Sequence, residues 1–175
     1  MLENEAMPKV LVLFDSADRG ADHLAEIAAD GARSVRFTEV DVRVVSDGMA
    51  SSGTRRRQLE SADLVDQYDA VIIVGSNRET PIAIDSLLAS LDRSTQGDFV
   101  DKVFAAIPAG GPTANRLSAT GAIAVGLRAG SPNQDAEARK TGERVAKVAE
   151  WVRHAISHEH GHSHSDHARS HRRAH

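Results

Sequence analysis

The chain has 175 residues, of which 41% are hydrophobic and 26% charged, and its formal net charge is −4. These values fit one ordinary globular domain and give no general attraction to nucleic acid or to membrane surfaces. The absence of cysteine excludes disulfides, thiol catalysis and thiolate metal sites, and no apolar run reaches the roughly 18 residues of a membrane span. The lack of cysteine does not fix the compartment, so cytoplasmic is our default expectation, and we expect neither nucleic-acid nor membrane partners.

Three segments differ in composition. Residues 1–7 are predicted to be a flexible extension, and residues 8–156 alternate apolar runs with helical patterns. Residues 157–175 have no apolar periodicity, and eight of the nine histidines lie between positions 154 and 175. We predict one folded domain at 8–156 followed by a disordered His-rich tail at 157–175.

The first half of the domain begins with a continuous apolar run, Lys9–Phe14, typical of a strand buried on both faces. A helix is predicted over Ala21–Asp30, with Gly31 as its stop. Apolar and polar residues alternate over 34–45, which indicates a second strand. The alternation slips by one residue near Glu39, and this slip suggests a bulge. A short polar helix is predicted over 55–66.

The second half contains two more apolar runs, at 69–75 and 102–107, separated by a helical pattern that starts after Pro81. A long helix is predicted to open at Ser131–Pro132 and to run to Ile156. Strands that alternate with helices indicate a parallel sheet covered by helices on both faces. We predict four strands, with 122–127 as a possible fifth strand at the edge.

Four stretches resemble the flavodoxin-like NAD(P)H:quinone oxidoreductases of the Trp-repressor-binding-protein (WrbA) type. They are KVLVLF with Ser16, YDAVIIVGSNRETPIAIDSLLASLD, KVFAAIPAGG, and TGAIAVGLRAGSPNQDAEARKTGERVAKVAEWV. The resemblance implies a flavodoxin-like three-layer α/β sandwich that binds FMN and uses a small-molecule electron donor and acceptor, and it suggests a homo-oligomer. It designates no catalytic acid or base.

The resemblance also implies a cofactor site in three loops that follow strands. Position by position, it assigns the FMN phosphate to Ser16, Arg19 and Gly20, and the flavin ring to Asn77, Arg78, Thr80, Gly110 and Gly111. The chain departs from the family here: acids surround the first loop, prolines 108 and 112 offer no N–H, and no aromatic residue lies in these loops.

Each loop has a simpler interpretation that the sequence leaves open. Asp18 or Asp22 can cap the following helix, and His23 can be a solvated or capping residue. The loop with Asn77 can be a polar connection into a helix that starts at Thr80–Pro81, and Gly110–Gly111 can merely turn the chain. The alternative function is then a flavin-free binding or assembly module.

The tail predicts metal binding, because neutral imidazoles favour Ni²⁺, Zn²⁺ and Cu²⁺ and a flexible chain can wrap several of them around one ion. The candidate ligands are His158, His160, His162, His164 and His167.

Overall fold

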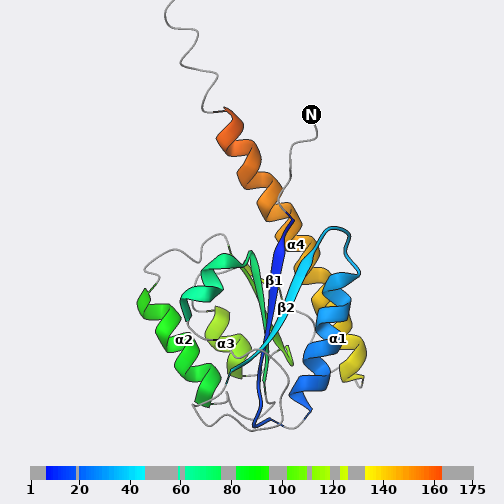
Figure 1. The fold of residues 1–175 in the computed structure, drawn as a ribbon, viewed down its shortest axis with the longest axis vertical. Coiled ribbons are helices and arrows are strands. Elements are labelled where there is room, and N and C mark those ends of the chain that lie inside the picture. The colour runs from blue at the N-terminus through cyan, green and yellow to red at the C-terminus, as the bar shows by residue number, and fades with distance from the viewer. Residues whose placement is uncertain are drawn as a thin grey trace, which may run out of the picture.

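The computed structural model describes residues 7–18, 20–45, 59, 62–75, 82–94, 102–109, 112–118, 123–125 and 133–162. Five parallel strands form one sheet in the order β2-β1-β3-β4-β5 (Figure 1). The strands are β1 (Lys9–Asp15), β2 (Glu39–Val45), β3 (Ala70–Val74), β4 (Val103–Ile107) and β5 (Ile123–Ala124). The helices are α1 (Ala21–Arg33), the 3-10 helix η1 (Ala62–Gln67), α2 (Ile82–Ser94), α3 (Pro112–Ser118) and α4 (Gln134–His162).

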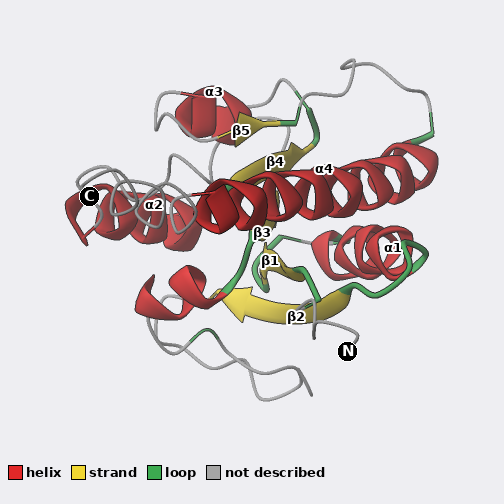
Figure 2. Ribbon diagram, turned by 90° about the horizontal axis from the view of Figure 1, so that it is seen from above, coloured by secondary structure: helices red, strands yellow, loops and turns green. Residues whose placement is uncertain are grey.

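The sheet separates two hydrophobic clusters, because successive side chains of each central strand point to opposite faces. Val10, Val12 and Phe14 pack toward α1 and α4, whereas Leu11 and Leu13 pack toward α2, α3 and η1. Helices therefore cover both faces (Figure 2). The three-layer α/β architecture predicted from the alternation is confirmed.

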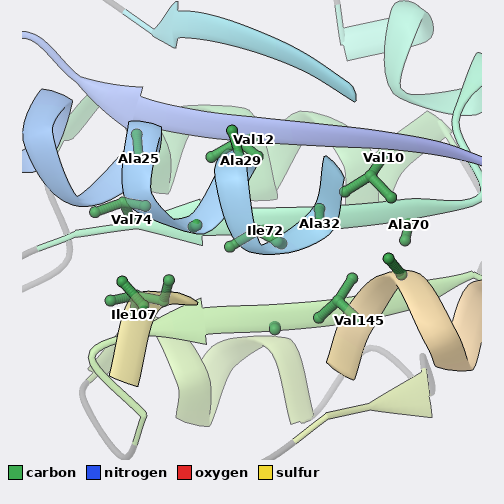
Figure 3. Close-up of a cluster of buried hydrophobic side chains, with 14 of the residues drawn as sticks. Val10, Val12, Ala25, Ala29, Ala32, Ala70, Ile72, Val74, Ile107 and Val145 are labelled. Atoms are coloured by element: carbon green, nitrogen blue, oxygen red, sulfur yellow. The ribbon is translucent and has the colours of Figure 1, made fainter. Parts of the chain in front are cut away.

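The α1–α4 layer is packed through small residues. Alanines 25, 29 and 32 of α1 lie in the same buried cluster as Val145 of α4 (Figure 3). A Cβ on Gly31 would lie 2.0 Å from the Arg139 carbonyl oxygen, and one on Gly142 would lie 1.9 Å from the Ala28 carbonyl oxygen. The two helices approach each other so closely that only glycine fits at these positions.

Bonds from side chains connect several elements at the edge where the strands begin. Asp69 Oδ2 accepts the Lys9 backbone N–H at 2.8 Å and an Arg153 N–H at 2.7 Å. Lys102 Nζ donates to the carbonyl oxygens of Asp66 and Tyr68, each at 2.9 Å, and so caps the end of η1. This network fastens β1, β3, β4 and α4 to one another.

Two predictions in the first half need correction. Gly31 does not stop α1, which continues to Arg33, because the glycine serves the helix contact and not a helix end. The strand begins at Glu39 and not at Ser34, and its pairing with β1 is continuous from Lys9↔Glu39 to Asp15↔Val45. The phase slip marks the start of the strand, so the bulge prediction is wrong.

The region around 55–66 lies mostly outside the described residues. Where it is described, the helix is the 3-10 segment Ala62–Gln67, which ends one residue after the predicted end at Asp66.

The second half adds two short elements. The edge strand left open at 122–127 exists as β5, so the sheet has five strands and not four. α3 was not predicted: Pro112 occupies its first position, where the missing N–H costs nothing, and Thr113 and Leu117 are buried.

α4 also extends beyond the predicted boundary. Asn133 starts it by accepting the Ala136 N–H at its side-chain oxygen, 3.1 Å away. The helix continues to His162, so residues 157–162 of the segment predicted to be disordered are helical. No glycine or proline interrupts the sequence between Gly142 and Gly161, and propagation adds one hydrogen bond per residue. The last turns project past the sheet, at the edge where β1 begins (Figure 1).

Candidate functional site

The predicted site lies at the edge where the strands end. Phe14, Val74 and Ile107 are paired across β1, β3 and β4, so the loops that follow these strands start side by side. The connection after β1 leads to β2 on one side, whereas the connection after β3 leads to β4 on the other side, so the strand order reverses between β1 and β3. In open parallel sheets this reversal point forms the crevice where ligands bind.

The loop after β1 is a tight turn organised by Asp15. This residue is 7% exposed, and its Oδ1 accepts the Ala17 N–H at 2.8 Å. Its backbone oxygen accepts the Asp18 N–H at 3.2 Å. The turn leaves Ser16 exposed and ends at Gly20, whose φ of 88° is the left-handed conformation that favours glycine.

The start of α1 is uncapped among the described side chains. Gly20 is the N-cap residue and forms no side-chain cap hydrogen bond, so the prediction that Asp18 or Asp22 caps the helix is wrong. The Ala21 N–H donates to the Asp18 backbone oxygen at 3.2 Å. The N–H groups of Asp22 and His23 belong to the first turn, where a helix provides no acceptor of its own. This turn therefore offers donors and a positive dipole end to an anion.

Acidic side chains oppose an anion at the same turn. Burial, followed by the charge of Asp15, raises the pKa of Asp18 above its ordinary value. The raised pKa means that the ionised form of Asp18 is already disfavoured before any ligand arrives. His23 of the same turn faces α4: its Nε2 lies 3.4 Å from Asp135 Oδ2, and both side chains are largely exposed. The described residues thus fit a phosphate group through the backbone, at an electrostatic cost from the side chains.

The loop that follows β4 is held by Glu137, a residue that our sequence analysis did not predict to take part in the site. Glu137 in the first turn of α4 is 8% exposed, and its Oε1 accepts the Ala109 N–H at 3.3 Å. The Glu137 backbone oxygen in turn accepts the Thr141 hydroxyl at 2.9 Å. An acid in a helix's first turn is ordinary in a sequence, and nothing local reveals that its partner is 28 residues away.

The structure brings together only part of the predicted cofactor set. Ser16 and Gly20 lie in one turn at the start of α1. The other predicted contacts lie outside the described residues: Arg19, Asn77, Arg78, Thr80, Gly110 and Gly111. The second loop is described only at Gly75, whose N–H donates to the Ile107 oxygen at 2.8 Å.

Two hollows lie elsewhere, near the edge where the strands begin. One of about 450 Å³ is lined by Lys9, Glu39, Val40, Asp41, Arg43, Gln67 and Tyr68. The other, of about 260 Å³, is lined by Asp69, Ala149, Val152, Arg153, Ile156 and Ser157. Neither includes a predicted cofactor residue. We place the candidate site at the crevice because topology and the uncapped helix point there, whereas the residues that line the two hollows lie toward the opposite edge of the sheet.

Within the described part of the chain, no three His, Asp or Glu side chains converge as a metal site. His158, His160 and His162 lie within α4, whereas His164 and His167 lie outside the described residues. Of the described helices, none combines the length and apolar character needed to cross a membrane.

Comparison with models of known protein families and with curated protein sequences finds no match. Solved structures do match. An archaeal flavodoxin superposes with a TM-score of 0.56 at 16% identity, over 81% of this chain and 99% of the flavodoxin. The fold is flavodoxin-like. A structure described as a flavone reductase gives a TM-score of 0.59 at 14% identity, over 84% of this chain and 65% of the reductase.

The flavodiiron protein from Giardia intestinalis gives a TM-score of 0.58 at 18% identity, and this chain spans only 38% of it. The flavodoxin-like fold agrees with the strand order β2-β1-β3-β4-β5, which belongs to the flavodoxin class of doubly wound sheets. Identities this low establish the fold alone.

Proposed function

We propose that this chain binds FMN at the crevice and acts as an NAD(P)H-dependent oxidoreductase on quinones, as a divergent relative of the WrbA type. The observation that carries the proposal is the uncapped start of α1, directly after β1 of a flavodoxin-like sheet. FMN, when bound, supplies hydride and electron transfer, and the protein supplies binding and orientation. A homo-oligomer is part of the proposal, and light scattering of the purified chain tests it.

In this proposal the chain's own groups have distinct roles. The first-turn N–H groups of α1, with Ser16 and Gly20, hold the phosphate, and Arg19 offsets the acids of the same loop. Asn77, Arg78, Thr80, Gly110 and Gly111 line the flavin ring. Glu137 positions the start of the third loop through the Ala109 N–H. We assign no general acid or base.

A flavin titration tests the proposal directly. Purified protein is expected to quench FMN fluorescence with saturable binding, and Ser16→Glu is expected to weaken that binding at least about tenfold through charge repulsion. Ser157→Glu is the matched control, because Ser157 is exposed on α4 and lies near Asp69 at the opposite edge of the sheet. Absence of FMN binding by the unchanged chain overturns the proposal.

The oxidoreductase step needs its own measurement. FMN-loaded protein is expected to oxidise NADH or NADPH in the presence of benzoquinone faster than the same concentration of free FMN. A rate equal to that of free FMN contradicts the reductase activity and leaves flavin binding standing.

A second candidate function is a flavin-free binding or assembly module whose His-rich tail binds Ni²⁺, Zn²⁺ or Cu²⁺. It is favoured by Asp15 and Glu137, because each accepts a loop N–H that a cofactor could otherwise use. We propose metal binding by the tail independently of the flavin. Titration of the chain truncated after Ile156 tests it: the metal stoichiometry should fall relative to the full chain, and an unchanged stoichiometry contradicts tail binding.

A further inference from the structure

We propose that the larger hollow, at the edge where the strands begin, is a binding site for a neutral polyhydroxylated ligand such as a monosaccharide. The starts of β1 and β2 and the end of η1 line this hollow of about 450 Å³. Its volume lies within the range of about 300–1,000 Å³ that is typical of small-molecule sites. The inference does not depend on FMN binding, because the crevice lies at the opposite edge of the sheet.

The side chains of β2 make this hollow polar. Glu39, Asp41 and Arg43 alternate along the strand, so they lie on one face of the sheet. Val45, the next residue in this alternation, is buried with Val65 of η1 in the hydrophobic cluster of that face. The apolar layer therefore ends at Val45, and charged residues replace it toward the start of the strand.

Hydrogen bonds fix one part of the lining. Asp41 Oδ2 accepts the Tyr68 hydroxyl at 2.6 Å and an Arg43 N–H at 3.1 Å. Burial, followed by the hydrogen bond to Asp41, raises the pKa of Tyr68, so the phenol stays uncharged at neutral pH. Lys102 donates to the Tyr68 backbone oxygen at 2.9 Å. Tyr68 is thus held between the hydrophobic cluster and the hollow, where its ring offers an apolar surface to a ligand.

The other part of the lining has looser hydrogen-bonding groups. Lys9 Nζ and Glu39 Oε2 are 3.6 Å apart, which is longer than a hydrogen bond, and both side chains are half exposed. Gln67 at the end of η1 is also exposed, and its amide carries both donors and an acceptor. One hollow therefore presents an ammonium, a carboxylate and an amide to a ligand.

The charges of the lining favour a neutral ligand. Two cations and two anions line the hollow, so their formal charges cancel: Lys9, Arg43, Glu39 and Asp41. An anion or a cation would add an uncompensated charge, which is costly to bury. A zwitterion would have to break one of the two ion pairs to place its charges. Hydroxyl groups can donate to a carboxylate and accept from an ammonium while both pairs persist, so a ligand with several hydroxyl groups fits this lining best.

The chain contains its own reporter for this site, because Tyr68 is the only tyrosine of the sequence. D-glucose, D-galactose and D-ribose are titrated to tens of millimolar into the full chain without FMN, and the Tyr68 ring resonances are followed by NMR. We expect saturable shifts with at least one sugar, at a dissociation constant on the order of 1 mM. Absence of shifts with all of these sugars overturns the proposal, and so do larger shifts with glycine or with inorganic phosphate.

A pair of glutamate variants tests the lining itself. Glu39→Ala removes the carboxylate beside Lys9 and is expected to weaken sugar binding about tenfold. Glu143→Ala is the matched control, because Glu143 pairs with Lys147 on α4 and its side chain is exposed to a similar extent, 44% against 51% for Glu39. The control is expected to leave the affinity unchanged, and equal losses in the two variants contradict the site. Thermal unfolding checks that both variants stay folded.

A competition experiment separates this site from the crevice. If FMN binds as proposed, saturating sugar should leave the FMN affinity unchanged, because the two sites lie at opposite edges of the sheet. A loss of FMN affinity on addition of sugar would place the sugar at the crevice and overturn the inference. Failure of FMN to bind overturns only the flavin proposal, since the sugar titration is made without FMN.

Discussion

At the edge where the strands begin, side chains bond to other parts of the protein; at the edge where they end, a helix start is left without a side-chain acceptor. Asp69 joins β3 to β1 and α4, and Lys102 closes the end of η1. At the opposite edge, Gly20 leaves α1 without a side-chain cap, and burial followed by the charge of Asp15 raises the pKa of Asp18. The first edge thus has side-chain bonds between elements, whereas the start of α1 at the second edge has no side-chain cap, and unsatisfied groups of this kind are common where proteins bind ligands.

The close contact of α1 with α4 connects the two edges, because both helices run from one to the other. This arrangement separates three classes of substitution. Changes at the first edge should lower the free energy of unfolding and leave ligand affinity at the crevice unchanged. Changes at the second edge should alter that affinity with little effect on the free energy of unfolding. Changes at the helix contact should affect both quantities.

The largest effect is expected at the helix contact. Gly142→Ala places a Cβ 1.9 Å from the Ala28 oxygen, so the helices must move apart. We expect a loss of about 3 kcal/mol in the free energy of unfolding and, if the FMN proposal holds, weaker FMN binding, because the starts of both helices shift. Urea unfolding and FMN titration measure the two effects. Arg139→Ala is the control, because the side chain of Arg139 is exposed and only its backbone takes part in the helix contact. A change in the free energy of unfolding beyond about 0.5 kcal/mol in this variant contradicts the explanation.

The next effect belongs to the first edge. Asp69→Ala removes the acceptor for the Lys9 N–H and for Arg153, and we expect a loss of about 2 kcal/mol in unfolding free energy. The melting temperature should fall by roughly 4–8 °C for a chain of this length. Asp66→Ala provides the control, because its carboxylate lies 4.0 Å from Lys102 and is 53% exposed. Equal losses in the two variants would refute the special role of Asp69.

A smaller loss in the free energy of unfolding is expected for Lys102→Met at the same edge. The substitution removes the ammonium that donates to the Asp66 and Tyr68 oxygens but keeps much of the apolar stem. We expect about 1–2 kcal/mol, measured by thermal unfolding, with FMN affinity unchanged. Lys140→Met, at an exposed position of α4, should stay within about 0.5 kcal/mol. A drop in FMN affinity for Lys102→Met would break the separation of the two edges.

The sequence predicts the sheet well because its strongest signals are local. The apolar runs at β1, β3 and β4 are found within one or two residues of their predicted bounds. The errors arise where a distant partner decides. Gly31 has the local signature of a helix stop, yet the position requires glycine because the backbone of Arg139 on α4 lies too close for a Cβ. The end of α4 was missed because a polar, His-rich composition hides a helix that continues from a well-packed segment.

The candidate site was predicted less completely, for the same reason. Family resemblance placed Ser16 and Gly20 in one turn, and the topology supports that turn as part of the crevice. Resemblance did not show that Asp15 accepts the Ala17 N–H or that Glu137 accepts the Ala109 N–H. Both are buried acids whose roles depend on where the backbone folds back.

The smallest effect on stability, and the most informative for the site, is expected for Asp18→Asn. Burial and then the charge of Asp15 raise the pKa of Asp18 in the folded state, so its ionised form opposes folding. That penalty is fully present above the folded-state pKa and fades as the pH falls through it toward the unfolded value. Asp18→Asn should therefore be slightly more stable than the unchanged chain at pH 7, and the difference should vanish in acid.

The same substitution should tighten FMN binding at low salt by up to about fivefold, because it removes a carboxylate that repels the phosphate. The gain should shrink at high salt, where the interaction is screened. Asp30→Asn, near the other end of α1 where Asp30 pairs with Arg33, should leave FMN affinity unchanged. Weaker FMN binding by Asp18→Asn would mean that the carboxylate itself contacts the ligand. The crevice would then be suited to a group that donates hydrogen bonds, and the phosphate assignment at the start of α1 would fail.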